Sequence, residues 1–232
     1  MSIHIFENEE LLYSNLKNEI ELKAKESIKE RGFFTLAISG GSLLKYLNNI
    51  KVEDAEKYYI FFADERHVPL DHPDANYFQA AEFLDQFDNE KVFVPSPVLT
   101  CSESAIEYGN RLKLFFNGSQ NVKLDLVLLG IGTDGHTASL FPGHSSLHST
   151  ELVISETNSP KLPKERVSLG LDVLDRSDVL FVVQGEAKKD ILLQIFESST
   201  LPASRIKGNV KWFVDRLAAL EIASRVFDNT FK

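Results

Sequence analysis

Apolar residues follow two different spacings along the chain, and stretches with the two spacings take turns. Leu12, Leu16 and Ile20 recur at helical intervals in a charged background, which predicts an amphipathic helix. Short continuous apolar runs, each followed by glycine or charged residues, predict buried strands. The predicted helices cover residues 11–32, 43–50, 76–87, 102–116 and 186–196, with a last helix after residue 215. The predicted strands cover residues 33–38, 58–63, 124–130, 152–155, 166–169, 179–183 and 210–214, and residues 64–73 are predicted to be a loop.

Strands separated by segments of helix length indicate parallel pairing through right-handed crossovers. We therefore predict an α/β fold: an open, mostly parallel, Rossmann-like sheet with helices on both faces. No repeat, low-complexity tract or linker interrupts the sequence, so a single domain is expected over residues 1–232. Ligands of such sheets bind beyond the carboxyl ends of the strands. The residues directly after each strand are therefore the candidates for a functional site.

Composition excludes several classes of protein. The chain has 25 Lys plus Arg against 34 Asp plus Glu, a net charge of −9, which argues against a nucleic-acid partner. No signal peptide is visible and no segment has the roughly 18 apolar residues of a membrane helix, so we expect a cytoplasmic protein. Cys101 is the single cysteine, which excludes an internal disulfide, and no histidines have metal-ligand spacing, so no metal site is expected. The oligomeric state, monomer or homodimer, is left open.

Two candidate segments follow the first two predicted strands. Gly40, Gly41 and Ser42 form a turn whose backbone N–H groups could approach a phosphate at the start of a helix, although a plain tight turn fits the same residues. Asp64 and Arg66 follow the next strand. A guanidinium can bind a phosphate with two hydrogen bonds, and the carboxylate could orient a catalytic partner. The alternative is a pair of exposed loop charges.

A glycine-rich loop after the most apolar strand is the most informative segment. It places Asp134 and His136 at the ligand edge of the sheet. A neutral imidazole can take a proton from water, and a neighbouring carboxylate can fix its tautomer. Backbone N–H groups of the same loop could face a developing oxyanion. The alternative is that His136 caps a helix starting near Thr137 and that Asp134 is a turn residue.

Two further cations lie near predicted strand ends. Arg166 begins a strand, and Lys188 lies where a strand passes into a helix. Either side chain could reach a phosphate at the same edge, although a lysine on a helix surface is usually only solvated. If these two residues and Arg66 lie together, the protein has a positive pocket on a negatively charged surface.

Taken together, these segments resemble the 6-phosphogluconolactonase family, which is related in fold to the glucosamine-6-phosphate deaminases. The resemblance runs nearly end to end, and its motifs are SGGS, ADERHVPLDHPDANY, LVLLGIGTDGHTASLFPG, ERVSLGLDVL, LFVVQGEAKKDIL, LPASRI and KWFVDRLAA. In the deaminases a similar Gly-His loop typically continues towards phenylalanine, asparagine and glutamate. Residues Thr137 to Pro142 therefore favour the lactonases.

The resemblance implies hydrolysis of 6-phospho-D-glucono-1,5-lactone, a small sugar-phosphate lactone of the oxidative pentose phosphate pathway, without metal or organic cofactor. It implies that His136 is the general base and that Asp134 is its loop neighbour. The substrate or phosphate contacts that it implies are Gly40, Gly41, Ser42, Arg66, Arg166 and Lys188.

One segment departs from the family pattern. Leu43 and Leu44 follow Ser42, where family members commonly have threonine and proline. The change removes a hydroxyl donor at that end of the site but leaves the backbone donors. Two other functions stay open from the sequence: a deaminase or sugar-phosphate isomerase on the same fold, and a sugar-phosphate sensor that has lost catalysis.

Overall fold

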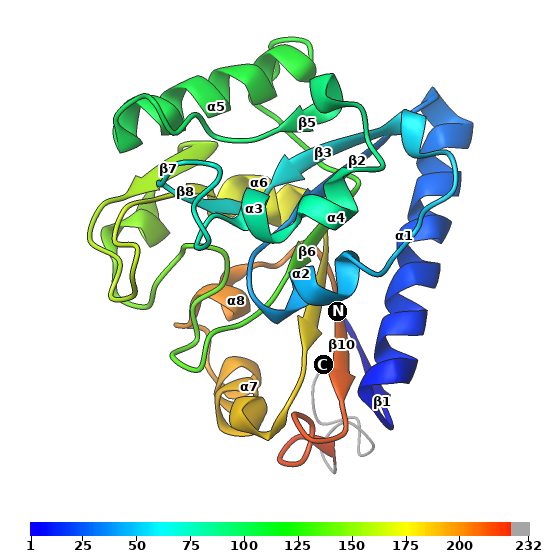
Figure 1. The fold of residues 1–232 in the computed structure, drawn as a ribbon. Helices are drawn as coiled ribbons and strands as arrows, with labels where there is room; N and C mark the ends of the chain where they lie inside the picture. The colour runs from blue at the N-terminus through cyan, green and yellow to red at the C-terminus, as the bar shows by residue number, and fades with distance from the viewer. Residues whose placement is uncertain (224–232) are drawn as a thin grey trace.

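Residues 1–223, the part of the chain that the computed structural model describes, form a seven-stranded sheet with helices on both faces (Figure 1). The strand order is β1-β10-β9-β6-β2-β3-β5, and every neighbouring pair is parallel. The predicted open parallel α/β sheet is thereby confirmed. Its strands are β1 (Ser2–Phe6), β2 (Phe34–Ile38), β3 (Tyr58–Phe62), β5 (Val92–Phe93), β6 (Leu126–Leu129), β9 (Asp178–Val183) and β10 (Asn209–Asp215).

The central strands are apolar on both faces because both faces are covered by helices. Successive side chains point to opposite faces of a strand, so Ala37 joins one hydrophobic cluster while Leu36 and Ile38 join the other. One cluster is covered by α1 (Glu9–Arg31), α2 (Ser42–Leu47), α3 (Asn76–Gln79) and α4 (Ala81–Leu84). The other is covered by α5 (Cys101–Phe115), α6 (Leu171–Arg176), α7 (Lys189–Glu197) and α8 (Pro202–Arg205).

A second, antiparallel sheet of three strands lies beside the parallel one in the described part of the chain, in the order β4 (Asp64–Arg66), β8 (Arg166–Leu169) and β7 (Val153–Glu156). The loop predicted for residues 64–73 is therefore wrong at its start. The charged residues of β4 do not look like a buried strand in the sequence, because their hydrogen-bond partners come from other segments of the chain. Glu65, for example, is 2% exposed and accepts from the backbone N–H groups of Asn76 and Tyr77.

Other departures from the predicted elements are local. Edge strands β1 and β5 lack a predicted counterpart, and the helix predicted over residues 76–87 is broken into α3 and α4. Asn48 fills the break, since its side chain donates to Gln79 O at 2.8 Å and accepts from Phe83 N at 3.1 Å. Residues 216–222 are turns, not the start of the predicted last helix, and most of that prediction lies outside the described residues.

The strand order places a topological switch point between β2 and β6. The chain passes from β2 to β3 on one side, whereas β6 leads to β9 on the other. In open α/β sheets the crevice at such a point, outside the carboxyl ends of the strands, is where ligands bind.

Candidate active site

A cleft of about 340 Å³ opens at this switch point, and the predicted segments converge on it. The predicted residues that line it are Gly40, Gly41, Ser42, Asp64, Arg66, His136, Arg166 and Lys188. Asp134 lies beside the lining residue His136, to which it is hydrogen bonded. The separate strand ends singled out in the sequence therefore form one site.

The Gly-Gly-Ser turn connects β2 to α2 and has steric reasons for its glycines. A Cβ on Gly40 would lie 2.2 Å from Asn76 Oδ1, and Gly41 has a φ of 90°, which is unfavourable for other residues. The backbone N–H groups of Gly40 and Gly41 have no acceptor among residues 1–223, so they are available to an anion. Leu43 is buried in the core below the turn.

The loop that carries His136 is held together by its own backbone. Gly132 N donates to His136 O at 2.8 Å, and Gly135 N donates to Gly132 O at 3.0 Å. A Cβ on Gly132 would lie 2.0 Å from His136 Nδ1, so the imidazole packs against the bare glycine backbone. Thr137 begins a tight turn that closes at Leu140, which rules out the helix that His136 would have capped.

His136 and Asp134 form a histidine–carboxylate pair. His136 Nδ1 lies 2.5 Å from Asp134 Oδ1, and because a carboxylate only accepts, Nδ1 carries the hydrogen and Nε2 keeps its lone pair. Burial of the imidazole lowers the pKa of His136 below its usual value, and this outweighs the opposing charge of Asp134. Burial acts to raise the pKa of Asp134, but the hydrogen bond and charge of His136, followed by those of Lys161, lower it to about 2. A neutral imidazole beside an ionised carboxylate is the form that a general base needs.

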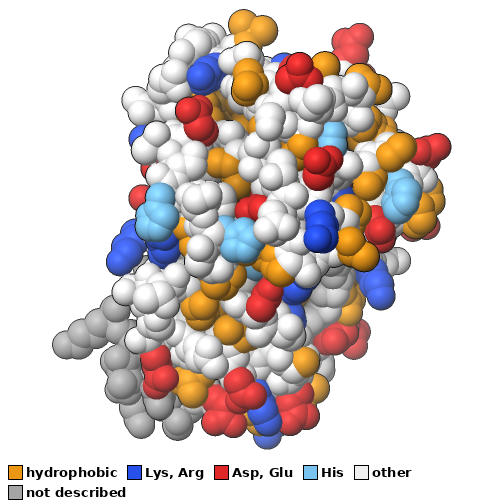
Figure 2. All heavy atoms as spheres, turned by 90° about the vertical axis from the view of Figure 1, so that its left-hand side faces the viewer, with side chains coloured by type: hydrophobic (Ala, Val, Ile, Leu, Met, Phe, Trp, Pro, Cys, Tyr) orange, Lys and Arg blue, Asp and Glu red, His pale blue; other side chains and the backbone are white. Residues whose placement is uncertain are grey.

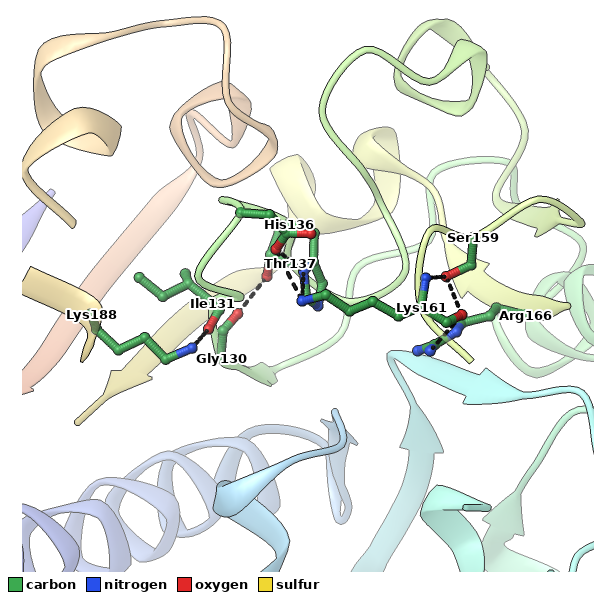
Figure 3. Close-up of polar contacts among 9 residues, drawn as sticks. Gly130, Ile131, His136, Thr137, Ser159, Lys161, Arg166 and Lys188 are labelled. Carbon is green, nitrogen blue, oxygen red and sulfur yellow. Dashed lines mark hydrogen bonds and ion pairs between the residues drawn. The ribbon is translucent and has the colours of Figure 1, made fainter. Parts of the chain in front are cut away.

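The three predicted cations lie together at the cleft, as the hypothesis of a positive pocket requires. Arg66 Nη1 donates to Asp74 O at 2.8 Å, and Arg66 Nε is buried without a hydrogen-bond partner in the described chain. Lys188 Nζ donates to Ile131 O at 2.7 Å (Figure 3). Burial and the nearby Arg66 lower the pKa of Arg166.

The surface outside the cleft carries the acidic excess. On the face shown in Figure 2, Asp and Glu side chains gather at the lower end, while across the middle His, Lys and Arg side chains lie with acidic side chains among them. Among the described residues, the lining of the cleft has four basic side chains and one acidic side chain. The net charge of the chain therefore does not describe its site.

Asp64 is paired with a serine and not with a candidate catalytic residue. Its Oδ2 accepts from Ser139 Oγ at 2.7 Å, and the carboxylate is 4% exposed. Asp64 thus ties strand β4 to the tight turn that follows His136. A direct role of Asp64 in binding a substrate stays a prediction.

Lys161, Ser39 and Gln184 also line the cleft and were not among the predicted site residues, although Ser39 and Gln184 lie within two of the motifs. Lys161 Nζ lies 3.1 Å from Asp134 Oδ1 and 3.2 Å from His136 Nδ1 (Figure 3). Ser39 Oγ and Gln184 Oε1 are buried at the cleft without a hydrogen-bond partner in the described part of the chain. Both residues follow predicted strands, which is a usable signal. Lys161 comes from the middle of a loop with a second lysine nearby, and no local pattern distinguishes it.

No three His, Cys, Asp or Glu side chains of residues 1–223 lie close enough to one another to hold a metal ion. Function without a metal stays a prediction. No described helix is both long and apolar enough to span a membrane.

Comparison with known proteins identifies the family. Residues 7–214 match the family described as glucosamine-6-phosphate isomerases/6-phosphogluconolactonase, and the chain belongs to this family. A probable 6-phosphogluconolactonase of Schizosaccharomyces pombe is 38% identical and covers 96% of both chains. A 6-phosphogluconolactonase of Rattus norvegicus is 34% identical and covers 94% of this chain and 92% of its own. The prediction of a hydrolase of the lactonase branch is thereby confirmed.

Solved structures agree with this family. A 6-phosphogluconolactonase from Trypanosoma cruzi matches with a TM-score of 0.85 and 26% identity over 96% of this chain and 97% of its own. A 6-phosphogluconolactonase from Thermotoga maritima has a TM-score of 0.83 at 24% identity over 93% of this chain and 99% of its own, which shows the shared fold.

Proposed function

We propose that the protein hydrolyses 6-phospho-D-glucono-1,5-lactone to 6-phosphogluconate, with His136 as the general base. The main observation is the position of the His136 imidazole, whose Nδ1 lies 2.5 Å from Asp134 Oδ1 and which lines a cleft with four basic side chains. The names of the relatives support this substrate. The other proposed substrate contacts are the predicted residues that line the same cleft.

In the proposed reaction, His136 Nε2 takes a proton from a water molecule as the water oxygen attacks the lactone carbonyl carbon. The π electrons move to the carbonyl oxygen, which becomes an oxyanion. As the oxyanion collapses, the bond from the carbonyl carbon to the ring oxygen breaks, and the ring oxygen takes the proton from His136. The carboxylic acid then loses a proton to solvent. Such base catalysis contributes about 10²–10⁴-fold.

The phosphate would bind at the end of the cleft away from His136. Free N–H groups of Gly40 and Gly41, the Ser42 hydroxyl and the guanidinium groups of Arg66 and Arg166 are the groups suited to it. Binding energy from this remote group would orient the carbonyl at His136.

An assay with freshly generated phosphorylated lactone, run beside unphosphorylated glucono-1,5-lactone, tests this function. We expect turnover of both above the uncatalysed rate and a much higher kcat/KM for the phosphorylated one. Arg66→Met should lower kcat/KM for the phosphorylated lactone by about 10²-fold, with little effect on the other. Arg176→Met, at a surface arginine, is the matched control.

Equal kcat/KM values for the two lactones would contradict phosphate anchoring. Release of ammonia from glucosamine 6-phosphate would support a deaminase instead. Tight binding of 6-phosphogluconate without any hydrolysis would support a sensor.

A further inference from the structure

The structure assigns a catalytic role to Lys161, which rests on the proposed function: we propose that its ammonium group leaves Asp134 when the lactone binds and stabilises the negative charge that develops on the carbonyl oxygen. The lysine stays protonated throughout and donates a hydrogen bond but no proton. It is therefore an electrostatic catalyst, separate from the base.

The first argument is that the backbone carrying the Lys161 side chain is held in place by hydrogen bonds. Lys161 lies in the loop between β7 and β8, where its backbone N–H donates to Ser159 Oγ at 3.1 Å. Ser159 Oγ donates in turn to Lys161 O at 2.9 Å. Arg166 donates from Nη2 to Leu162 O at 3.0 Å and from Nε to Pro163 O at 2.9 Å. The backbone of the loop is thus fixed, and only the long stem of Lys161 extends across to His136 (Figure 3).

The second argument is that the ammonium group at the end of this stem has more donors than acceptors within reach. An ammonium group has three donors and no acceptor. His136 Nδ1 already donates to Asp134, so it cannot also accept from Lys161 Nζ, which lies 3.2 Å away. Asp134 Oδ1, at 3.1 Å, is therefore the only satisfactory partner of this ammonium group among the described residues.

The ion pair with Asp134 is weak enough to be given up. The side chains of Lys161 and Asp134 are 41% and 36% exposed, and exposed ion pairs of this kind contribute about 0–1 kcal/mol. The other cations of the cleft donate to backbone carbonyls. Lys188 is bound to Ile131 O, and Arg66 to Asp74 O. Lys161 is the basic group of the cleft for which no such bond from the side chain exists in the described structure.

The third argument is the position of the charge. The carbonyl oxygen must lie close to His136, because the base and the carbonyl carbon share one attacking water. Lys161 Nζ is within hydrogen-bond distance of the imidazole. Three backbone N–H groups of the same loop, those of Gly132, Gly135 and Thr137, donate to carbonyls within the loop, which reduces the number of loop donors that an oxyanion could use. The ammonium group can supply a charged donor at this place.

The movement also increases the basicity of His136. Apart from burial, the charge of Lys161 lowers the pKa of His136, while Asp134 on the same loop and Asp64 on β4 raise it. When Lys161 moves to the carbonyl oxygen, Asp134 is left with its hydrogen bond from Nδ1. His136 then accepts the proton of water more readily at the moment when water must be activated.

Lys161→Met tests the proposal because it removes the charge and keeps most of the stem. We expect kcat to fall by about 10²-fold and by the same factor on the phosphorylated and unphosphorylated lactones, with KM little changed. The acid limb of the pH profile should move to higher pH, because the pKa of His136 rises without the lysine. Lys161→Arg, which restores a cation, should recover part of kcat.

Lys164→Met is the matched control, because it removes one charge from the same loop at an exposed position. It should leave both rates unchanged. A rise in KM confined to the phosphorylated lactone would make Lys161 a phosphate ligand and overturn the proposal. Unchanged kcat in Lys161→Met, with an active wild-type protein, would overturn this proposal alone. An inactive wild-type protein would overturn the proposed function, and this proposal with it.

Discussion

Two histidine–carboxylate pairs pack against one aromatic ring, and only one of the two histidines lines the cleft. The His136 ring centroid is 4.8 Å from that of Phe141, and the His144 ring centroid is 5.5 Å from that of Phe141. His144 Nδ1 lies 2.9 Å from Glu156 Oε2, much as His136 lies beside Asp134. The two pairs therefore allow the proposed catalytic arrangement to be compared with a second arrangement of the same groups.

The difference lies in which member of each pair is buried. The His136 side chain is 17% exposed and that of Asp134 is 36% exposed. In the second pair the order is reversed, because the His144 side chain is 27% exposed and that of Glu156 is 8% exposed. Glu156 also accepts from Asn158 N at 2.9 Å, so its carboxylate is engaged in holding a turn.

The surroundings of the two pairs also differ in charge. The second pair lines a separate groove of about 810 Å³ between α5 and β7, where the described lining has one basic side chain, Lys113, against Glu151 and Glu156. The cleft at His136 has the opposite balance. The partly buried imidazole among cations fits the proposed anionic substrate, whereas the second pair connects the loop to β7.

The largest expected effect separates the two histidines directly. His136→Gln should lower kcat by about 10²–10⁴-fold, because the base is lost, measured as lactone loss above the uncatalysed rate. His144→Gln should retain nearly full activity and lose about 1 kcal/mol of unfolding free energy through its weakened hydrogen bond. Near wild-type turnover in folded His136→Gln would remove His136 from the role of base.

Substitution of the two carboxylates should also have different effects, one on kcat and the other on stability. Asp134→Asn should lower kcat by roughly 10²–10³-fold, because an amide can donate to Nδ1 and so place the proton on Nε2, the wrong tautomer for a base. Glu156→Gln should instead lower the free energy of unfolding by about 1–3 kcal/mol at nearly unchanged kcat. Denaturant unfolding and steady-state kinetics on both variants measure the two effects. Equal losses of kcat in the two variants would contradict different roles for the two carboxylates.

Two glycines beside the pairs provide a third comparison. Gly132→Ala should lower kcat by about 10²-fold, because the new Cβ displaces the imidazole from its place. Gly109→Ala lies in α5 beside the second groove, where the new Cβ would meet Val153 at an ordinary 3.7 Å. It should raise the unfolding free energy by about 0.5–1 kcal/mol without changing kcat. An active Gly132→Ala protein would show that the tight contact is dispensable.

The smallest expected effect is on pH dependence. Since burial lowers the pKa of His136, the acid limb of kcat/KM should have its midpoint below the usual histidine value of about 6.5. The unfolded chain binds this proton more readily than the folded one. Folding stability should therefore fall as pH falls from about 6.5 through the lower folded-state value. His136→Gln should remove this part of the pH dependence, and a limb above 6.5 would contradict the assignment.

The sequence predicted the parts of the site that depend on local chain geometry. Gly40 and His136 follow apolar strands, and the carboxyl ends of parallel strands share one edge, so their convergence could be expected from the pattern alone. The partners of Asp64 and Lys161 could not, because Ser139 and Asp134 are distant in the chain and are brought close only by tertiary packing. Strand β4 was missed for the same reason: charged residues predict a strand only if their buried partners are known.

The cleft is formed by both sheets, because the chain passes almost directly from β3 to β4. Ala63 alone separates the parallel sheet from the antiparallel one, and Ala63 O accepts from Leu169 N at 2.8 Å across the junction. His136 and Lys188 come from loops of the first sheet, whereas Arg66 and Arg166 belong to the second. Both sheets therefore contribute residues to the cleft, and the junction at Ala63 holds the two sets in one arrangement.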